Sequence, residues 1–166
     1  MIVLGVDSGV TGAIAFLSHN RLPDVVDLPT IPTEGGSITR RVHGPGLKNL
    51  IRERCPVGEP VMVVIEQLAG GGRMPDGSSR GNAMSVASQI DSHVTVRTVC
   101  ELLGLQPRVV HPRTWKKFFG LDADKKKSLA LARQLFPACS ELLKRQADNN
   151  RAEALLVARW ALQNLT

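Results

Sequence analysis

Two apolar runs, each ending in a carboxylate, dominate the hydrophobic pattern of this 166-residue chain. The first covers residues 2–6 and stops at Asp7, and the second covers residues 61–65 and stops at Glu66. Because apolar residues occupy consecutive rather than alternate positions, the pattern predicts strands that are covered on both faces of a sheet. If these strands are parallel neighbours, the two carboxylates lie at the same end of the sheet.

Periodicity and turn residues predict the remaining elements. Ala13–Leu17 and Asp24–Leu28 are predicted strands that continue the sheet beside the first strand, and Arg108–His111 is a short further strand. The stretch from Pro29 to His43 has no periodicity and is predicted to be a loop. Helices are predicted over residues 45–54, 82–103, 112–120, 124–136 and 150–164. These elements predict an α/β fold in one domain over residues 1–166: a mixed sheet of three antiparallel strands followed by β-α-β-α, flanked by helices.

Residues 69–81 are rich in glycine and carry two arginines, Arg73 and Arg80. Such a composition predicts a mobile arm. Arg73 and Arg80 could fold onto nucleic acid, and a plain disordered loop is the alternative.

Composition narrows the class of partner. Lys and Arg number 21 against 15 Asp and Glu, a net charge of +6, which favours a polyanion such as nucleic acid over a membrane surface. No apolar run approaches the ~20 residues of a membrane span, and no signal peptide precedes the first strand. The three cysteines and four histidines show neither a disulfide framework nor a metal-ligand spacing. We therefore expect a cytoplasmic protein of a bacterium, a phage-infected cell or an organelle.

Carboxylates at the strand ends predict a metal site. Two carboxylates held side by side repel each other, and one tends to protonate unless a cation intervenes. A hard divalent ion such as Mg²⁺ prefers such oxygen ligands. The alternative roles are ordinary ones, since Asp is common in hairpin turns and strand ends often reach solvent.

The last predicted helix adds a third acid. Glu153 lies beside an apolar stripe formed by residues 154, 158, 161 and 165, so it leans toward the sheet, where a buried carboxylate needs a partner such as a metal. The alternative is a capping box between Asn150 and Glu153. Asp148 can reach the same site only if it precedes the helix, because five helical residues turn by roughly 140°. Its alternative role is a helix cap.

Basic residues gather between positions 108 and 127. Lysines close to a metal site would hold a phosphate backbone and offset charge in a transition state, whereas a solvated helix face is the alternative. The residues that we assign to DNA binding on this basis, together with the glycine-rich arm, are Arg73, Arg80, Arg113, Lys117, Lys125 and Lys126.

Four stretches in this order resemble the RuvC-type Holliday junction resolvases of the RNase H and retroviral integrase superfamily: residues 3–15, 64–67, 112–117 with 125–127, and 151–158. The resemblance implies an RNase H-like fold and a nuclease that binds a four-way DNA junction as a homodimer and nicks two strands symmetrically. It implies metal binding by four acidic positions and charge stabilisation by two lysines. The residues that match are Asp7, Glu66, Asp148 and Glu153 for the metal, and Lys116 and Lys127 for the lysines.

Two departures from the family pattern concern the fourth acid and the junction-opening residue. Asp148 does not have the commonest spacing of acids three apart, and residues 68–72 contain no aromatic wedge after Glu66. Two Mg²⁺ ions per site, or Mn²⁺ in their place, would activate water and stabilise the leaving oxygen. A two-fold dimer would supply two matched sites, with the long helix after the arm as its interface or as an ordinary core helix.

Other functions fit parts of the same pattern. A relative of the same superfamily could cut RNA or an RNA–DNA hybrid, and a non-catalytic relative would bind DNA without a metal. Residues 7–12 also resemble the first phosphate loop of the actin, Hsp70 and sugar kinase group, but 166 residues leave no room for that group's second domain.

Overall fold

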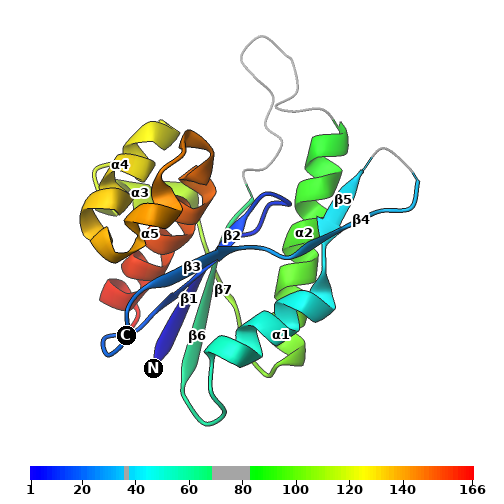
Figure 1. Cartoon of the computed structure of the whole chain (residues 1–166), viewed down its shortest axis with the longest axis horizontal. Helices are drawn as coiled ribbons and strands as arrows, with labels where there is room; N and C mark the ends of the chain where they lie inside the picture. The colour runs from blue at the N-terminus through cyan, green and yellow to red at the C-terminus, as the bar shows by residue number, and fades with distance from the viewer. Residues whose placement is uncertain (36–37, 69–82) are drawn as a thin grey trace.

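A five-stranded mixed sheet forms the centre of the computed structural model, which describes residues 1–35, 38–68 and 83–166. The strand order is β3-β2-β1-β6-β7 (Figure 1). The strands are β1 (Ile2–Asp7), β2 (Ala13–Leu17), β3 (Asp24–Asp27), β6 (Val61–Glu66) and β7 (Arg108–Val110).

Strand directions agree with the sequence pattern. Strands β1, β2 and β3 pair antiparallel, whereas β6 is parallel to both β1 and β7. In the β1–β6 register Val6 pairs with Ile65, so Asp7 and Glu66, the last residues of the two strands, lie side by side at one end of the sheet. The expected placement of these two acids at one end of the sheet is confirmed.

Helices cover both faces of the sheet (Figure 1). Helices α1 (Gly44–Arg54) and α2 (Ala83–Leu102) pack on one face, and α3 (Pro112–Phe118), α4 (Lys125–Leu135) and α5 (Asn149–Asn164) pack on the other. The two sides of β1 enter different core clusters: Leu4 and Val6 lie in the cluster with α1 and α2, and Val3 lies in the cluster with α5. Two apolar faces explain the consecutive apolar positions of β1 and β6.

The prediction of a loop over residues 29–43 is wrong. Strands β4 (Thr30–Pro32) and β5 (Arg40–Val42) pair antiparallel in a hairpin outside the main sheet. Val42, only 3% exposed, anchors the hairpin in the core beside Val96 and Val99 of α2. Strands of three residues are too short to show an alternating pattern, and only the tertiary contact of Val42 reveals them.

Residues before α5 also differ from expectation. Two 3₁₀ turns, η1 (Pro137–Leu143) and η2 (Gln146–Asp148), precede the helix, which begins at Asn149. The capping box between Asn150 and Glu153 does not form, because the Glu153 side chain accepts a hydrogen bond from Lys116 and the Asn150 side chain bonds Thr11. Within the described part of the chain, no helix combines the length and apolar character needed to cross a membrane.

Gly5 lets α5 lie directly on β1. A Cβ at this position would stand 2.3 Å from the carbonyl oxygen of Ala154 and 2.4 Å from the amide nitrogen of Ala158. Ala154 and Ala158 are themselves small and fully buried, so backbone packs on backbone at this contact. This close approach brings the first turns of α5 to the end of the sheet where Asp7 and Glu66 emerge.

Gly5→Ala is expected to destabilise the fold by about 3 kcal/mol, because the added methyl meets backbone atoms that cannot move without lifting α5. Urea unfolding followed by circular dichroism measures the change. Gly44→Ala is the matched control, since its added Cβ would make only ordinary contacts, 3.5 Å from Val99 and 3.7 Å from Thr95. Equal stability of the two variants would contradict the proposed close packing.

Candidate active site

A cleft of about 350 Å³ opens at the carboxyl ends of β1 and β6. Three carboxylates line it, from three separate segments of the chain: Asp7, Glu66 and Glu153. Two lysines from the helices on the α5 side, Lys116 and Lys125, complete its charged lining. The uncharged lining includes Ser8, Thr11, Gln67, Gln89, Pro112 and Asn150.

Each carboxylate is held by a hydrogen bond on one oxygen. The indole Nε1 of the fully buried Trp115 donates to Glu66 Oε2 at 2.9 Å, and Lys116 Nζ donates to Glu153 Oε1 at 2.8 Å. The Gly9 amide makes a longer contact of 3.5 Å to Asp7 Oδ1. Among the described residues, the second oxygen of each carboxylate has no hydrogen-bond donor. These oxygens leave acceptor capacity for a cation.

Burial, followed by repulsion between the neighbouring carboxylates, raises the pKa of two of the acids. Burial, reinforced by the Glu153 carboxylate, raises the pKa of Asp7 to about 6, while Lys125 and Lys116 act in the opposite direction. Burial, together with Glu153 and Asp7, raises the pKa of Glu66 to about 7 against the opposing effects of Lys116 and the Trp115 hydrogen bond. The ionised forms of both groups are therefore costly until a positive charge enters the cleft.

Two lysines occupy the site, although only one of them was expected there as a catalytic group. Lys116 is 15% exposed in its side chain, bonds Glu153, and lies 5.0 Å from the centre of the Trp115 ring. Lys125, expected from the sequence to bind DNA, lines the cleft and acts electrostatically on Asp7. Lys127 lies outside the cleft lining, is exposed, and pairs with Asp122. Asp124 caps α4, and this helix start turns the first of three consecutive lysines toward the acids.

Asp148 is not brought to the cleft. It is 3% exposed, accepts hydrogen bonds from the Arg145 amide at 2.7 Å and guanidinium at 2.8 Å, and lies 3.8 Å from Arg151. Although burial acts against ionisation, these donors hold the pKa of Asp148 below its ordinary value. Asp148 is the residue before α5, but its side chain makes no capping hydrogen bond to that helix; its carboxylate closes the preceding 3₁₀ turn, η2, instead.

Asn150, considered from the sequence only as a helix cap, lines the cleft instead. Its Nδ2 donates to the Thr11 carbonyl at 2.7 Å and to Thr11 Oγ1 at 3.1 Å, which ties α5 to the turn that follows Asp7. The signal was available, since Asn150 stands three residues before Glu153 and so shares its helix face. The choice between positions 148 and 150 depends on where the helix begins.

Trp115 and Ser8 are two further residues that the sequence did not single out for the site. Trp115 is a fully buried core residue, and it also orients Glu66. Ser8, 2% exposed, bonds His93 Nδ1 of α2 at 3.0 Å through its hydroxyl. Partners 49 and 85 residues away in sequence leave no local pattern to find.

Apart from Lys125, the residues expected to bind DNA lie outside the cleft lining or outside the described residues. Arg113 and Lys117 are exposed on α3, and Lys126 is exposed at the start of α4. The positions of Arg73 and Arg80 fall outside the described residues. The two helix starts therefore present positive charge next to the lysines that line the cleft.

The donor set fits a hard divalent cation, although the side chains are not arranged as ready ligands. Within residues 1–35, 38–68 and 83–166, no three His, Cys, Asp or Glu side chains are placed to hold a metal ion as they stand. The three acids nevertheless line one cleft and interact with one another electrostatically. Lys116 holds Glu153 by one oxygen and supplies part of the missing positive charge. Small side-chain rotations bring carboxylates to an ion that attracts them, so the donor chemistry of the cleft still suits a divalent cation.

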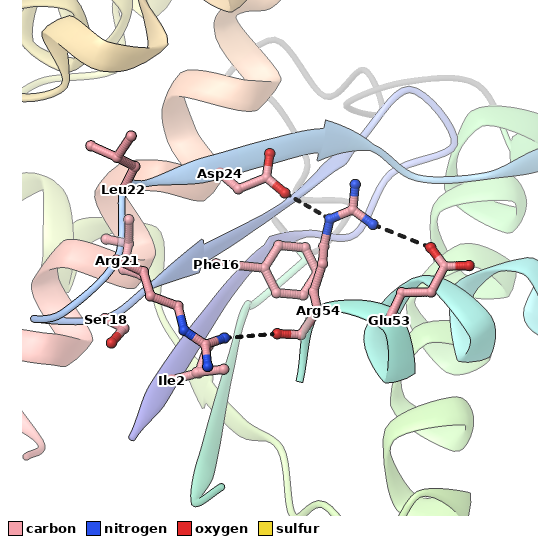
Figure 2. A pocket seen from close by; sticks show the side chains of 9 residues that line it. Ile2, Phe16, Ser18, Arg21, Leu22, Asp24, Glu53 and Arg54 are labelled. Carbon is pink, nitrogen blue, oxygen red and sulfur yellow. Dashed lines mark hydrogen bonds and ion pairs between the residues drawn. The ribbon is translucent and has the colours of Figure 1, made fainter. Parts of the chain in front are cut away.

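A second cleft, of about 250 Å³, lies at the opposite end of β1 (Figure 2). Its charges are already paired: Arg54 Nε donates to Asp24 Oδ2 at 2.7 Å, and Arg21 Nη1 donates to the Arg54 carbonyl at 3.4 Å. The Arg54 guanidinium lies 5.6 Å from the centre of the Phe16 ring. Because the charges in this cleft already pair with one another, they stabilise the contact between neighbouring segments and are not available to an ionic ligand.

Comparison with known proteins supports the same architecture. RuvC of T. thermophilus in complex with a Holliday junction substrate matches with a TM-score of 0.56 and 16% identity, over 99% of this chain and 96% of that chain. Another Thermus thermophilus RuvC structure matches with a TM-score of 0.52 and 15% identity, over 98% and 96%. This chain has the RuvC fold. The predicted RNase H-like mixed sheet with flanking helices is thereby confirmed.

Local sequence identity leads in the same direction. The chloroplastic Holliday junction resolvase MOC1 of Chlamydomonas reinhardtii is 50% identical over 52 residues. That stretch covers 30% of this chain and 6% of the relative, so the match spans only a small part of the relative's length. No protein-family model matches the sequence.

Glu66→Gln is expected to stabilise the metal-free protein at pH 8 by about 1–3 kcal/mol. The folded protein holds the Glu66 proton with a pKa of about 7, against an ordinary value of 4.5. Protons therefore bind more tightly to the folded state, and the free energy of unfolding falls as pH rises from about 4.5 to about 7. The variant lacks this loss. Urea unfolding at pH 5 and pH 8 in EDTA measures the difference.

Glu53→Gln is the control for that comparison, since Glu53 is 71% exposed at the far end of α1. It should follow the wild-type pH profile. If the Glu66→Gln variant and the wild type lose stability in parallel as the pH rises, the pKa of Glu66 is not raised in the folded protein.

Proposed function

We propose that this protein is a metal-dependent endonuclease that resolves four-way DNA junctions by paired symmetric nicks. The observation that carries the proposal is the convergence of Asp7, Glu66 and Glu153 on one cleft with Lys116 and Lys125 beside them. The fold shared with RuvC and the local identity to a chloroplastic Holliday junction resolvase support a junction as the substrate. The net charge of +6 fits a polyanionic partner.

Three carboxylates would hold the metal in this proposal. Asp7 and Glu66 are adjacent through the parallel register of β1 and β6, and Glu153 faces them from α5. We propose two Mg²⁺ ions per site, with Mn²⁺ as an alternative, because oxygen donors suit both. Bound ions would lower the pKa of a water nucleophile and act as Lewis acids on the phosphate. Asp148, tied to Arg145 and Arg151, is left out of this set.

The protein's own residues would orient the reacting groups. Trp115 holds one oxygen of Glu66 by its indole N–H and leaves the other oxygen without a donor among the described residues. Lys116 and Lys125 line the cleft and would offset the negative charge that develops on a bound phosphate. Asn150 fixes the turn after Asp7 through Thr11 and so limits the motion of the first acid.

Asp7→Asn is expected to lower the rate of junction nicking in Mg²⁺ by about 10²-fold or more, because the amide removes a charge that the metal requires. Cleavage of a labelled synthetic four-way junction measures the rate, with linear duplex and RNA–DNA hybrid as alternative substrates and EDTA as a blank. Asp122→Asn, which alters an exposed acid outside the cleft lining, should cut at the wild-type rate.

Each outcome of that assay assigns the function. Paired nicks in the junction alone, lost in EDTA and in Asp7→Asn, support the proposal. Cutting of RNA or of the hybrid would keep the metal site and reassign the substrate. Tight junction binding without cutting in either metal would favour a DNA-binding relative and overturn the proposed nuclease activity.

We also propose that two copies pair through α2. Its buried residues include Val96 and Cys100, and its opposite side carries exposed apolar residues beside charged ones. Ile90 and Val94 are 50% and 54% exposed and stand one turn apart. A four-way junction offers two strands to cut, and a two-fold dimer would present two equivalent sites. A second copy of α2 is the occupant that this symmetry favours.

Val94→Glu is expected to convert a dimer into a monomer, since a buried, unpaired carboxylate at such an interface costs more than one side chain contributes. Sedimentation velocity over a range of protein concentrations measures the assembly state. Leu22→Glu is the matched control, because Leu22 is an 81% exposed apolar residue far from α2 in the β2–β3 loop. A monomeric wild-type protein would refute the α2 dimer.

The compartment expected from the sequence stays a prediction. The relative with local identity is chloroplastic by name, which is compatible with an organelle among the expected compartments.

A further inference from the structure

The β4–β5 hairpin forms a groove beside the candidate active site. The groove has a volume of about 370 Å³, and its walls come from the hairpin, the turn after β1 and the first turns of α2. Thr11 lines both this groove and the catalytic cleft, so the two hollows are adjacent. In Figure 1 the hairpin projects beside α2 at the end of the molecule where β1 and β6 finish.

The described lining of this groove combines an arginine with hydroxyl groups. Arg40 comes from β5, Thr39 precedes it, Thr11 lies at the cleft side, and Ser88 comes from α2. Hydroxyl groups and arginine are common donors to phosphate and sugar oxygens of DNA. Val10 and Met84 supply apolar surface between these donors. Among the described residues, no carboxylate belongs to the lining, so this part of the groove is positive and rich in donors.

Arg40 keeps its charge available to a ligand. Its Nη2 donates to the neutral hydroxyl of Thr30 on the paired strand, which orients the guanidinium without neutralising it. Across the described ranges, Arg40 has no carboxylate within ion-pair distance, whereas Arg21, Arg54 and Arg151 each have one. An exposed arginine fixed in direction but left uncompensated is suited to a phosphate.

We propose that this groove binds the sugar–phosphate backbone of the junction strand next to the one being cut. The proposal rests on the proposed junction-resolving function and adds to it a second binding surface, separate from α3 and α4. The hairpin holds its position because Val42 is buried against α2. The strand would enter the catalytic cleft past Thr11, whose contact with Asn150 connects the groove to α5.

Arg40→Ala tests the groove through binding instead of catalysis. Junction affinity is measured by fluorescence anisotropy in EDTA at several salt concentrations. Loss of one phosphate contact should weaken binding by roughly tenfold and reduce the slope of log K against log salt by about 1. Arg52→Ala is the matched control: Arg52 is exposed near the end of α1, makes no ion pair among the described residues, and lies away from the groove.

Cross-linking supplies an independent measurement. A benzophenone attached to Thr39→Cys should cross-link to the junction, whereas the same probe on Leu22→Cys, at the far cleft, should not. The wild-type protein treated with the same reagent gives the background from Cys55, the cysteine that is not fully buried.

The outcomes separate the groove from the proposed function. If the wild-type protein prefers the junction but Arg40→Ala keeps the affinity and salt slope of Arg52→Ala, the groove proposal is overturned and the function stands. Cross-linking from both cysteine positions alike would overturn it as well. If the wild-type protein binds no DNA, the function and the groove both fail. A selective loss in Arg40→Ala together with selective cross-linking from Thr39→Cys supports the groove.

Discussion

Close packing of α5 on β1 is the constraint on which the rest of this structure depends. Gly5 presents only backbone to the helix, and the alanines at positions 154 and 158 let the helix backbone approach it. This approach sets how far Glu153 enters the cleft between the ends of β1 and β6. A side chain at position 5 would raise the helix, and the third acid would retreat from the other two.

The same contact creates an electrostatic problem that the site solves only in part. Three carboxylates face one cleft, and burial with mutual repulsion raises the pKa of both Asp7 and Glu66. Two consecutive residues of α3 stabilise two of these carboxylates: Trp115 donates a hydrogen bond to Glu66, and Lys116 forms an ion pair with Glu153. The remaining oxygens have no donor among the described residues, and this unmet demand is the physical reason that the site suits a cation.

Positive side chains lie on two surfaces beside the cleft, and both surfaces suit contact with a large polyanion. Helices α3 and α4 bring lysines to the α5 side of the acids, and the β4–β5 hairpin brings Arg40 to the α2 side. At the opposite end of the sheet, Arg21 and Arg54 are bound to carboxylates and carbonyls of the protein itself. Arginines therefore stabilise contacts within the protein at one end of the sheet, whereas Arg40 remains available to a ligand at the other.

The sequence by itself determined the sheet and the first two acids. Consecutive apolar residues ending at Asp7 and Glu66 predict buried parallel strands, and strand geometry then places both side chains at one edge, whatever the rest of the chain does. Glu153 was also within reach, because its place beside an apolar helical stripe depends only on helix periodicity.

Only the tertiary structure decided which nearby polar residues join these acids. The helix start at Asn149 directs Asn150 into the cleft and leaves Asp148 with Arg145, and the cap at Asp124 selects Lys125 over Lys127. A shift of one residue turns a helical side chain by 100°, so an uncertainty of one or two residues in a helix start reverses such assignments. The roles of Trp115 and the β4–β5 hairpin depend on partners far away in sequence, and no local pattern encodes those contacts.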